Sequence, residues 1–113
     1  MKEFIKVTKA LSDPTRVKIL KMLQKRVLCV CEIQSVLDRA QSTISKHLKI
    51  LEDAGLILYR KDGLWVNYEM ADGTQSLYAA SLIGNIHHWL DDDPEIIDIM
   101  TKLPAIDRND IIK

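Results

Sequence analysis

The hydrophobic pattern of the chain changes from helical to strand period at Gly55, and this change constrains the fold more than any other feature. Before Gly55, apolar residues recur at helical spacing. The run that follows, LILYRKDGLWVNYEM, has the composition of two β-strands rich in aliphatic and aromatic residues. Asp62-Gly63 divides this run and is typical of a two-residue hairpin turn. The sequence therefore predicts a mainly helical α+β fold with one β-hairpin.

Helical segments are predicted on both sides of this hairpin. Before it, apolar spacing predicts a short helix through Phe4, Val7 and Leu11, and further helices over about 14–25, from near Cys31 to Leu37, and over about 41–54. Asp13-Pro14 is typical of a helix start and Gly55 of a helix end. After the hairpin, the sequence predicts a helix over about 75–90 and a short helix that begins at Asp93-Pro94, whereas the polar end DRNDIIK is expected to fray.

The helix over 41–54 has the composition of a helix that reads DNA. It follows a short helix across the tight break DRA, and the two form a helix-turn-helix pattern with the hairpin as a wing. The stripe of Ile44, Leu48 and Leu51 is expected to be buried. Opposite this stripe lie side chains suited to bases and phosphates, namely Gln41, Ser42, Thr43, Ser45, Lys46 and Lys49.

Three further residues complete the predicted DNA surface. Arg60 and Lys61 lie at the tip of the wing, where they are expected to touch the neighbouring DNA backbone. His47 lies beside the buried stripe, and the sequence leaves open whether it packs or contacts a phosphate. The net charge is zero, yet residues 1–61 carry 13 Lys or Arg against 6 Asp or Glu, and residues 62–113 carry 3 against 10. The first half can therefore present a basic face to double-stranded DNA.

The helix over 75–90 has more apolar surface than one core requires. Two overlapping stripes run along it, one of Tyr78, Leu82, Ile86 and Trp89 and the other of Ala79, Ile83 and Leu90. A helix needs one stripe to dock on its own core. The surplus stripe therefore predicts burial against a second subunit.

Length and composition indicate one domain in the cytoplasm. With 113 residues, 47% of them hydrophobic, the chain can bury a small core. No apolar run approaches the roughly 20 residues needed to span a membrane, and the N-terminus lacks the apolar core of a signal peptide. We expect residues 1–92 to form a winged helix-turn-helix domain for DNA binding and dimerisation, and residues 93–113 to add a short helix and tail to that domain.

The motifs ALSDPTRVKIL, LCVCEI, AQSTISKHLKILEDAGLI and RKDGLWVNYEM follow one another in the chain. In this order they resemble the ArsR/SmtB family of metal-sensing winged-helix repressors, and its arsenical-resistance repressors most closely. The resemblance covers roughly residues 5–90. It implies a homodimer formed through the first and last helices, binding to palindromic operator DNA, and release of that DNA when a metal or metalloid ion binds.

The cysteines of the chain, Cys29 and Cys31, are candidate metal ligands. Thiolates favour soft ions, and the curl of the chain into a helix would let the two sulfurs converge, while the helix N-terminus would lower the thiol pKa. The resemblance assigns the pair to As(III) or Sb(III) as inducer. Several arsenical repressors have a third cysteine where this chain has Gln34. Either two thiolates suffice, with a solvent or small-thiol ligand, or affinity is reduced.

Two other kinds of ion site are alternatives within the same family. Cadmium and lead sensors combine such a pair with cysteines from the N-terminal segment, and no cysteine precedes the pair here. Zinc sensors carry a pattern on the last helix that falls on Asp72, Thr74, Asn85 and His88, of which only the first and last match. His87 and His88 are therefore expected to be surface or interface residues.

A different class of protein, a thiol redox protein or an arsenite carrier, is a weaker alternative. The Cys-x-Cys spacing differs from the Cys-x-x-Cys of thioredoxin-like motifs, and no catalytic triad, phosphate loop or paired-carboxylate signature accompanies it. We expect neither enzyme activity nor an organic cofactor.

Overall fold

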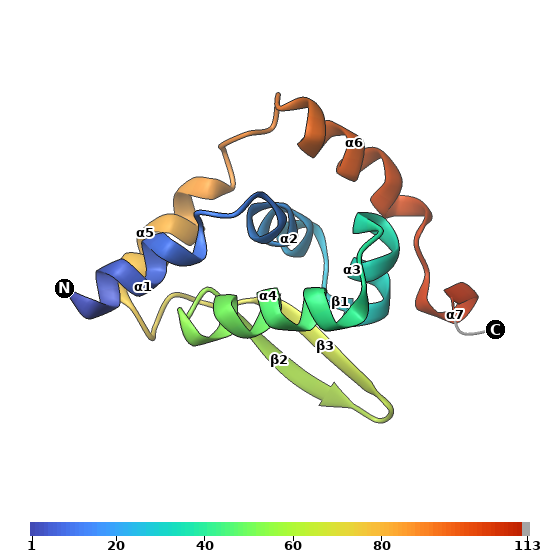
Figure 1. Cartoon of the computed structure of the whole chain (residues 1–113), viewed down its shortest axis with the longest axis horizontal. Helices are drawn as coiled ribbons and strands as arrows, with labels where there is room; N and C mark the ends of the chain where they lie inside the picture. Colours follow the sequence, from blue (N-terminus) through green and yellow to red (C-terminus); the bar gives the residue numbers. More distant parts are fainter. Residues whose placement is uncertain (112–113) are drawn as a thin grey trace.

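The computed structural model describes residues 1–111 and confirms a mainly helical winged helix-turn-helix fold (Figure 1). Its elements are α1 (Lys2–Ala10), α2 (Pro14–Lys25), β1 (Leu28–Cys29), α3 (Val30–Leu37), α4 (Gln41–Asp53), β2 (Ile57–Asp62), β3 (Trp65–Met70), α5 (Leu77–Ile86), α6 (Pro94–Lys102), the 3-10 helix η1 (Leu103–Ala105) and α7 (Arg108–Ile111). Helices α3 and α4 form the helix-turn-helix, and β2 and β3 form the wing. No helix within residues 1–111 combines the length and apolar character needed to cross a bilayer. The predicted tail extends to residues 112 and 113, which lie outside the described residues.

Aspartates start α2 and α6 as predicted. The Asp13 carboxylate accepts hydrogen bonds from the backbone N–H groups of Thr15 and Arg16, at 2.8 and 3.2 Å. Asp93 accepts one from the N–H group of Glu95 at 2.9 Å. A proline follows each aspartate at the first helical position, where its missing N–H group leaves no helical hydrogen bond unmade.

Gly55 ends α4, also as predicted. Its φ of +77° lies in the left-handed region, which glycine adopts without a steric penalty. The N–H group of Leu56 donates to the carbonyl of Leu51 at 3.1 Å, and that of Gly55 donates to Glu52 at 2.9 Å. This pair of bonds is a Schellman cap, and it turns the chain from α4 into the wing.

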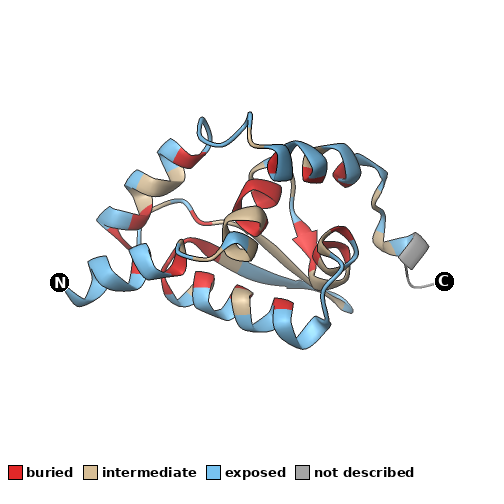
Figure 2. Cartoon of the chain, turned by 45° about the horizontal axis from the view of Figure 1, so that its top comes forward, coloured by how far each residue is buried: buried red, intermediate tan, exposed pale blue. Residues whose placement is uncertain are grey.

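The hydrophobic core lies between the helices and the inner face of the sheet, with buried residues on their inward sides (Figure 2). Its largest fully buried apolar side chains are Val7, Ile19, Leu20, Met22, Leu28, Ile33, Ile44, Leu48, Leu51 and Leu56. Burial of one such aliphatic side chain stabilises a fold by roughly 1.5–3 kcal/mol. The stripe predicted on α4 is thus the stripe that the core uses.

The turn of the wing lies one residue later than predicted. Asp62 pairs with Trp65, so the two-residue loop is Gly63-Leu64 and not Asp62-Gly63. This register leaves Gly63 at the first loop position with a φ of +61°, a conformation that glycine adopts without strain. Leu64 is fully exposed at the tip.

A short strand, β1, was not predicted. Leu28 and Cys29 pair antiparallel with Tyr68 and Asn67 of β3, which gives the sheet the order β1-β3-β2. Two residues are too few for a periodic signal in the sequence. This strand attaches the first cysteine directly to the wing.

Helix α5 is shorter than the predicted helix over 75–90. It begins at Leu77, because the Ser76 hydroxyl caps it by accepting from the N–H group of Ala79 at 3.2 Å. It ends at Ile86, so that the residues of both stripes beyond this point, Trp89 and Leu90, lie outside the helix.

A buried lysine explains the early end of α5. Lys21 of α2 is 2% exposed, and its ammonium group donates to the carbonyls of Ile86 and Trp89, at 3.0 and 2.7 Å. It also donates to the Asp91 carboxylate at 2.7 Å. The last carbonyls of a helix lack helical partners, and a cation can satisfy them. This residue therefore links α2 to the connection between α5 and α6.

The C-terminal segment is ordered further than predicted. Helix α6 packs on α2 and α3, where Lys18 pairs with Glu95 at 3.1 Å. The expected fraying is wrong up to residue 111, because α7 follows. The guanidinium of Arg108 holds this end by lying 4.5 Å from the ring centre of Trp65 and by donating to the side chain of Asn67 at 2.9 Å.

Candidate nucleic-acid interface and thiol pair

Helix α4 presents its predicted DNA-reading side chains to solvent. Because its buried stripe faces the core, the opposite face is turned outward. The exposed predicted residues are Gln41, Ser42, Thr43, Ser45, Lys46 and Lys49. Ala40 precedes the helix and offers no side-chain cap. The N–H groups of the first turn can therefore receive an anion.

His47 is half-buried, and its ring contacts Arg16. The Nδ1 atom lies 3.1 Å from Nη1 of Arg16. A guanidinium can only donate, so Nδ1 accepts and the proton of the neutral ring is on Nε2. Arg16 also donates to the carbonyls of Ala10 and Lys9, at 2.7 and 3.3 Å. This arginine, which was not predicted as a site residue, joins the end of α1 to α4.

The predicted basic DNA contacts on α4 and the wing differ in their ion-pair partners. Lys49 pairs with Glu52 and Asp53 on its own helix, at 3.6 and 3.3 Å, and these acidic groups raise its pKa. Arg60 pairs with Glu69 across the wing at 2.9 Å. Among residues 1–111, Lys46 and Lys61 form no ion pair. The exposed pairs contribute little to stability.

The two cysteines adjoin at the junction of β1 and α3. Cys29 ends β1 and caps α3, with 3% of its surface exposed, whereas Cys31 in the first turn of α3 is half-buried. The sequence led us to expect a thiol pKa lowered by the helix N-terminus, and for Cys29 this is wrong. Burial, a hydrogen bond with the Cys31 side chain and the nearby Glu32 carboxylate raise the pKa of Cys29 to about 12.

Glu32 forms hydrogen bonds with Cys29 at the start of α3. Its Oε1 atom accepts a hydrogen bond from the N–H group of Cys29 at 3.0 Å, and its own N–H group donates to the Cys29 sulfur. This reciprocal pair is a capping box in which cysteine takes the position usual for serine or threonine. Glu32 is 6% exposed, and Arg26 neutralises its charge in an ion pair.

The donor set fits a soft ion with two protein ligands. The Cys31 side chain is close enough to Cys29 to contribute to its raised pKa, and convergence of the two sulfurs on one ion stays a prediction. Within residues 1–111, no group of three or more His, Cys, Asp or Glu side chains comes together as a metal site. Gln34, at the position of the absent third thiol, is half-buried. Further ligands would have to come from outside this set.

The residues of the partial zinc pattern have other partners. The Asp72 carboxylate accepts hydrogen bonds from the backbone and hydroxyl of Thr74, at 3.0 and 2.7 Å. The Asn85 amide donates to the carbonyl of Ser81 at 2.7 Å. His87 and His88 are both exposed, with ring centres 4.9 Å apart.

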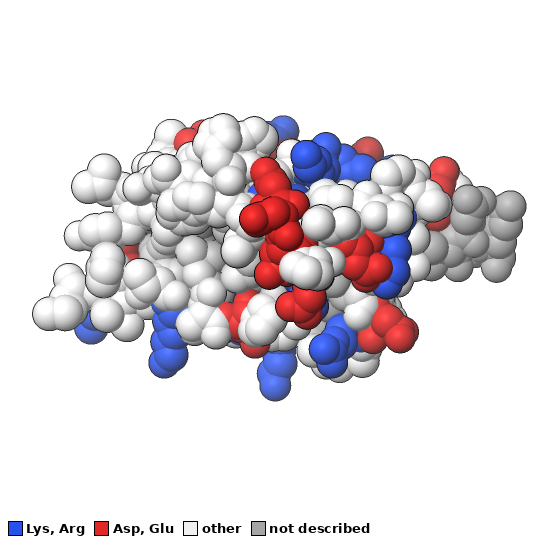
Figure 3. Space-filling view, turned by 90° about the horizontal axis from the view of Figure 1, so that it is seen from above, with Lys and Arg blue, Asp and Glu red and all other residues white. Residues whose placement is uncertain are grey.

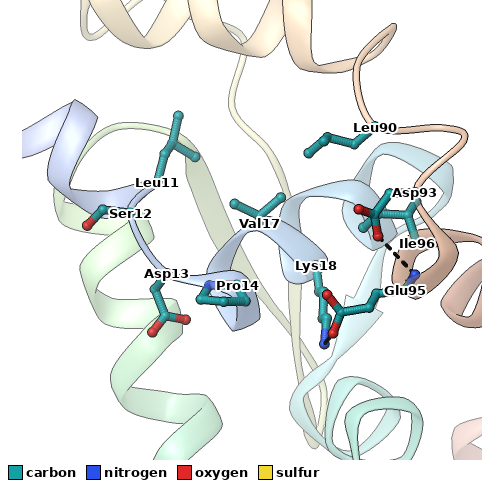
Figure 4. Close-up of a pocket in the computed structure, with 10 residues that line it drawn as sticks. All are labelled: Leu11, Ser12, Asp13, Pro14, Val17, Lys18, Leu90, Asp93, Glu95 and Ile96. Atoms are coloured by element: carbon teal, nitrogen blue, oxygen red, sulfur yellow. Dashed lines mark hydrogen bonds and ion pairs between the residues drawn. The ribbon is translucent and has the colours of Figure 1, made fainter.

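The face opposite α4 and the wing is acidic at its centre. Figure 3 shows Asp and Glu side chains gathered over α6 and the α5–α6 connection, where Asp91, Asp92, Glu95 and Asp98 are exposed. A hollow of about 340 Å³ adjoins this face, between the α1–α2 connection and the start of α6. Leu11, Val17 and Leu90 line it, and Lys18 meets Glu95 at its edge (Figure 4). The hollow contains no thiol.

Known proteins share this sequence and fold. Residues 13–59 match the sequence pattern described as bacterial regulatory protein, arsR family. The arsenical resistance operon repressor of Escherichia coli is 43% identical over 68 residues, which is 59% of this chain but only 58% of that protein. The arsenic resistance transcriptional regulator ArsR2 of Pseudomonas putida is 33% identical over 106 residues, covering 89% of this chain and 91% of that one. HlyU from Vibrio cholerae superposes with a TM-score of 0.64 at 31% identity, over 76% of this chain and 89% of that structure. The chain therefore belongs to the arsR family of bacterial regulatory proteins.

Proposed function

We propose that the chain is a repressor that binds operator DNA as a homodimer and releases it when As(III) or Sb(III) occupies Cys29 and Cys31. The observation that carries this proposal is the position of the thiol pair, at the start of the helix that packs directly on α4. The E. coli and P. putida relatives, which are named for arsenical and arsenic resistance, support it.

The DNA half of the proposal rests on α4 and the wing. The uncapped first turn of α4 meets a phosphate, while Gln41 and the hydroxyls beside it reach base edges in the major groove. Lys46, which is not paired within the described residues, neutralises a second phosphate. The acidic face lies over α6 and the α5–α6 connection, away from α4 and the wing, so it does not oppose this approach (Figures 1 and 3).

The sensing half rests on the constraints around Cys29. A soft ion supplies a centre that holds two thiolate sulfurs at one fixed distance. The Cys29 backbone pairs with Asn67, and its N–H group and sulfur both bind Glu32. A change in the sulfur position therefore disturbs the first turn of α3. Because α3 packs on α4, this disturbance reaches the DNA surface, with an expected coupling of about 1–3 kcal/mol, or a 5- to 150-fold loss of affinity.

The dimeric assembly in this proposal rests on apolar surface that one chain leaves open. Leu77 at the start of α5 is 80% exposed, and Phe4 and Ile5 of α1 are each nearly half exposed. The rings of Phe4 and Tyr78 meet edge to face at 5.3 Å, so α1 and α5 form one continuous apolar face. A second copy that covers this face would place two α4 helices in successive major grooves, about 34–36 Å apart.

A DNA-binding titration with and without arsenite tests the proposal. We expect the protein to shift its own promoter DNA in a gel, with affinity that falls steeply as salt rises. Arsenite should release the DNA and produce sulfur–metalloid absorption in the near ultraviolet. If cadmium, lead or zinc releases the DNA and arsenite does not, the proposed inducer is wrong and that metal ion takes its place. Absence of promoter binding would contradict the repressor assignment and leave the thiol redox or carrier class.

Two serine variants provide the matched controls. Cys31→Ser removes the half-buried thiol, and Cys29→Ser keeps a side-chain acceptor at the cap of α3, where serine is favoured. Both should bind the promoter as the wild type does but ignore arsenite. If either variant still dissociates on arsenite, the thiol pair is not the sensor.

A further inference from the structure

The C-terminal segment, residues 103–108, lies against the outer face of the sheet beside the thiol pair. Leu28 and Tyr68 form a cross-strand pair on the inner face, with Leu28 fully buried and Tyr68 packed on the core. Successive strand residues alternate between faces, so the next pair, Cys29 and Asn67, faces outward. Cys29 is nevertheless only 3% exposed, because other parts of the chain cover it.

Arg26 joins the cap of the thiol helix to this segment. One nitrogen of its guanidinium, Nη2, donates to both the Glu32 carboxylate and the carbonyl of Ile106, the latter at 2.8 Å. The other oxygen of Glu32 accepts the N–H group of Cys29. A continuous line of hydrogen bonds therefore runs from the first cysteine to the C-terminal segment.

Arg108 joins the same segment to the wing. It lies two residues after Ile106, and its guanidinium rests on the ring of Trp65 and donates to Asn67. Trp65 is the first residue of β3, next to the turn of the wing. A cation over a tryptophan ring is attracted to the ring. The hydrogen bond to the Asn67 side chain also fixes the orientation of the Arg108 guanidinium.

A hollow of about 450 Å³ lies beside the segment, bounded by Arg26, Glu32, Asn67, Ile106 and Arg108. Among the described residues, Arg26 and Arg108 make the polar contacts that join the segment to the body of the protein. A shift at the cap of α3 can therefore act on the wing through these side chains.

We propose that Arg26 and Arg108 transmit the occupancy of the thiol pair to the wing through residues 103–108. This inference rests on the proposed function and adds a second route to the one through α3 and α4. With the thiols free, the two arginines hold Trp65 and the wing in the position that DNA requires. Occupation of the thiols shifts Glu32, and Arg26 then displaces Ile106 and Arg108. Both arginines are positioning residues, since neither is a ligand of the ion.

Fluorine resonance on the full-length protein tests this route. Labelling with 5-fluorotryptophan gives signals for Trp65 and Trp89, and Trp65→Phe assigns them. We expect arsenite to move the Trp65 signal in the wild type and to leave it in place in Arg108→Met, which keeps the aliphatic stem but no donor. The near-ultraviolet absorption should show equal arsenite binding in both proteins. Lys102→Met, at an exposed residue that pairs only with Asp98 among the described residues, is the matched control and should behave as the wild type.

Promoter affinity provides the second measurement. The factor by which arsenite lowers affinity should be about 2- to 30-fold smaller in Arg108→Met than in the wild type, the range expected for a residue within a coupling network. An unmoved Trp65 signal in arsenite-loaded wild type, or an equal arsenite effect in both proteins, overturns this inference alone. If the wild type itself ignores arsenite, the proposed function fails and this inference fails with it.

Discussion

Cys29 and Arg60 lie in one row of the three-stranded sheet, because both are paired with Asn67 of the central strand. Neighbouring strands are about 4.8 Å apart, so the two backbones are separated by about 10 Å. Residues in such a row project from the same face. The candidate sensor thiol and a basic residue of the wing are therefore parts of one rigid element, although 30 residues separate them in the sequence.

This row predicts different roles for the two basic residues of the wing. Arg60 projects from the outer face and is held by Glu69, whereas Lys61 projects from the inner face and has no ion pair within residues 1–111. Lys61→Ala should lower the slope of log affinity against log salt by about 1, as expected for one lost phosphate contact. Arg60→Ala should have a smaller effect. Fluorescence anisotropy with labelled promoter DNA at several salt concentrations measures both slopes, and an unchanged slope for Lys61→Ala would place the wing away from the backbone.

Lys21 gives a prediction about stability. Lys21→Met preserves the length of the side chain but leaves the carbonyls of Ile86 and Trp89 without their donor. We expect a loss of about 2–4 kcal/mol in the free energy of unfolding, the range for removing one partner from buried polar groups. Urea unfolding followed by circular dichroism measures it. Lys25→Met, at an exposed position of the same helix, should change stability by less than about 0.5 kcal/mol. Equal losses in both variants would show that the hydrogen bonds of Lys21 do not stabilise the fold.

The elements with local signals were predictable from the sequence. Asp13, Asp93 and Gly55 act within a few residues of themselves, so the starts of α2 and α6 and the end of α4 agree with prediction. The end of α5 depends on Lys21, which lies 65 residues before Ile86. No local pattern encodes such a contact, and the predicted helix was therefore too long.

The same distinction applies to the candidate site. The exposed residues of α4 were predictable because helical period alone decides which face turns outward. The three arginines that connect the site, Arg16, Arg26 and Arg108, were not, since each acts on elements distant in sequence. The raised pKa of Cys29 was missed for a related reason: the effect of the helix N-terminus is local, whereas burial is a property of the whole fold.

Asp13 gives a prediction about acid stability. Burial opposes its ionisation, yet the backbone N–H groups of Arg16 and Thr15, together with the nearby Arg16 guanidinium, hold the pKa of the carboxyl below its usual 3.8. Its contribution to stability is therefore present above the pKa of the unfolded chain and is lost as pH falls through the folded value. Asp13→Asn retains a capping oxygen without a charge. The wild type should exceed this variant in stability at pH 6, and the difference should shrink towards pH 3 in urea unfolding; a difference independent of pH would contradict the charge effect.

The apolar face of α1 and α5 gives a prediction about assembly. Leu77 is 80% exposed in one chain, so Leu77→Asp should leave the monomer fold intact. At a dimer interface, however, a desolvated and unpaired carboxylate costs several kcal/mol. We expect the wild type to be a dimer at micromolar concentration and the variant to have half its mass by light scattering.

Ile97→Asp is the matched control for this change. Ile97 is an apolar residue of α6 with 51% of its surface exposed, and it lies away from the contact between Phe4 and Tyr78. The same charge at this position should leave the mass unchanged. Promoter affinity should fall for Leu77→Asp and not for Ile97→Asp, because a monomer engages one half-site only. A wild type that is monomeric at these concentrations, or a Leu77→Asp variant that remains dimeric, would show that this face does not join the two copies.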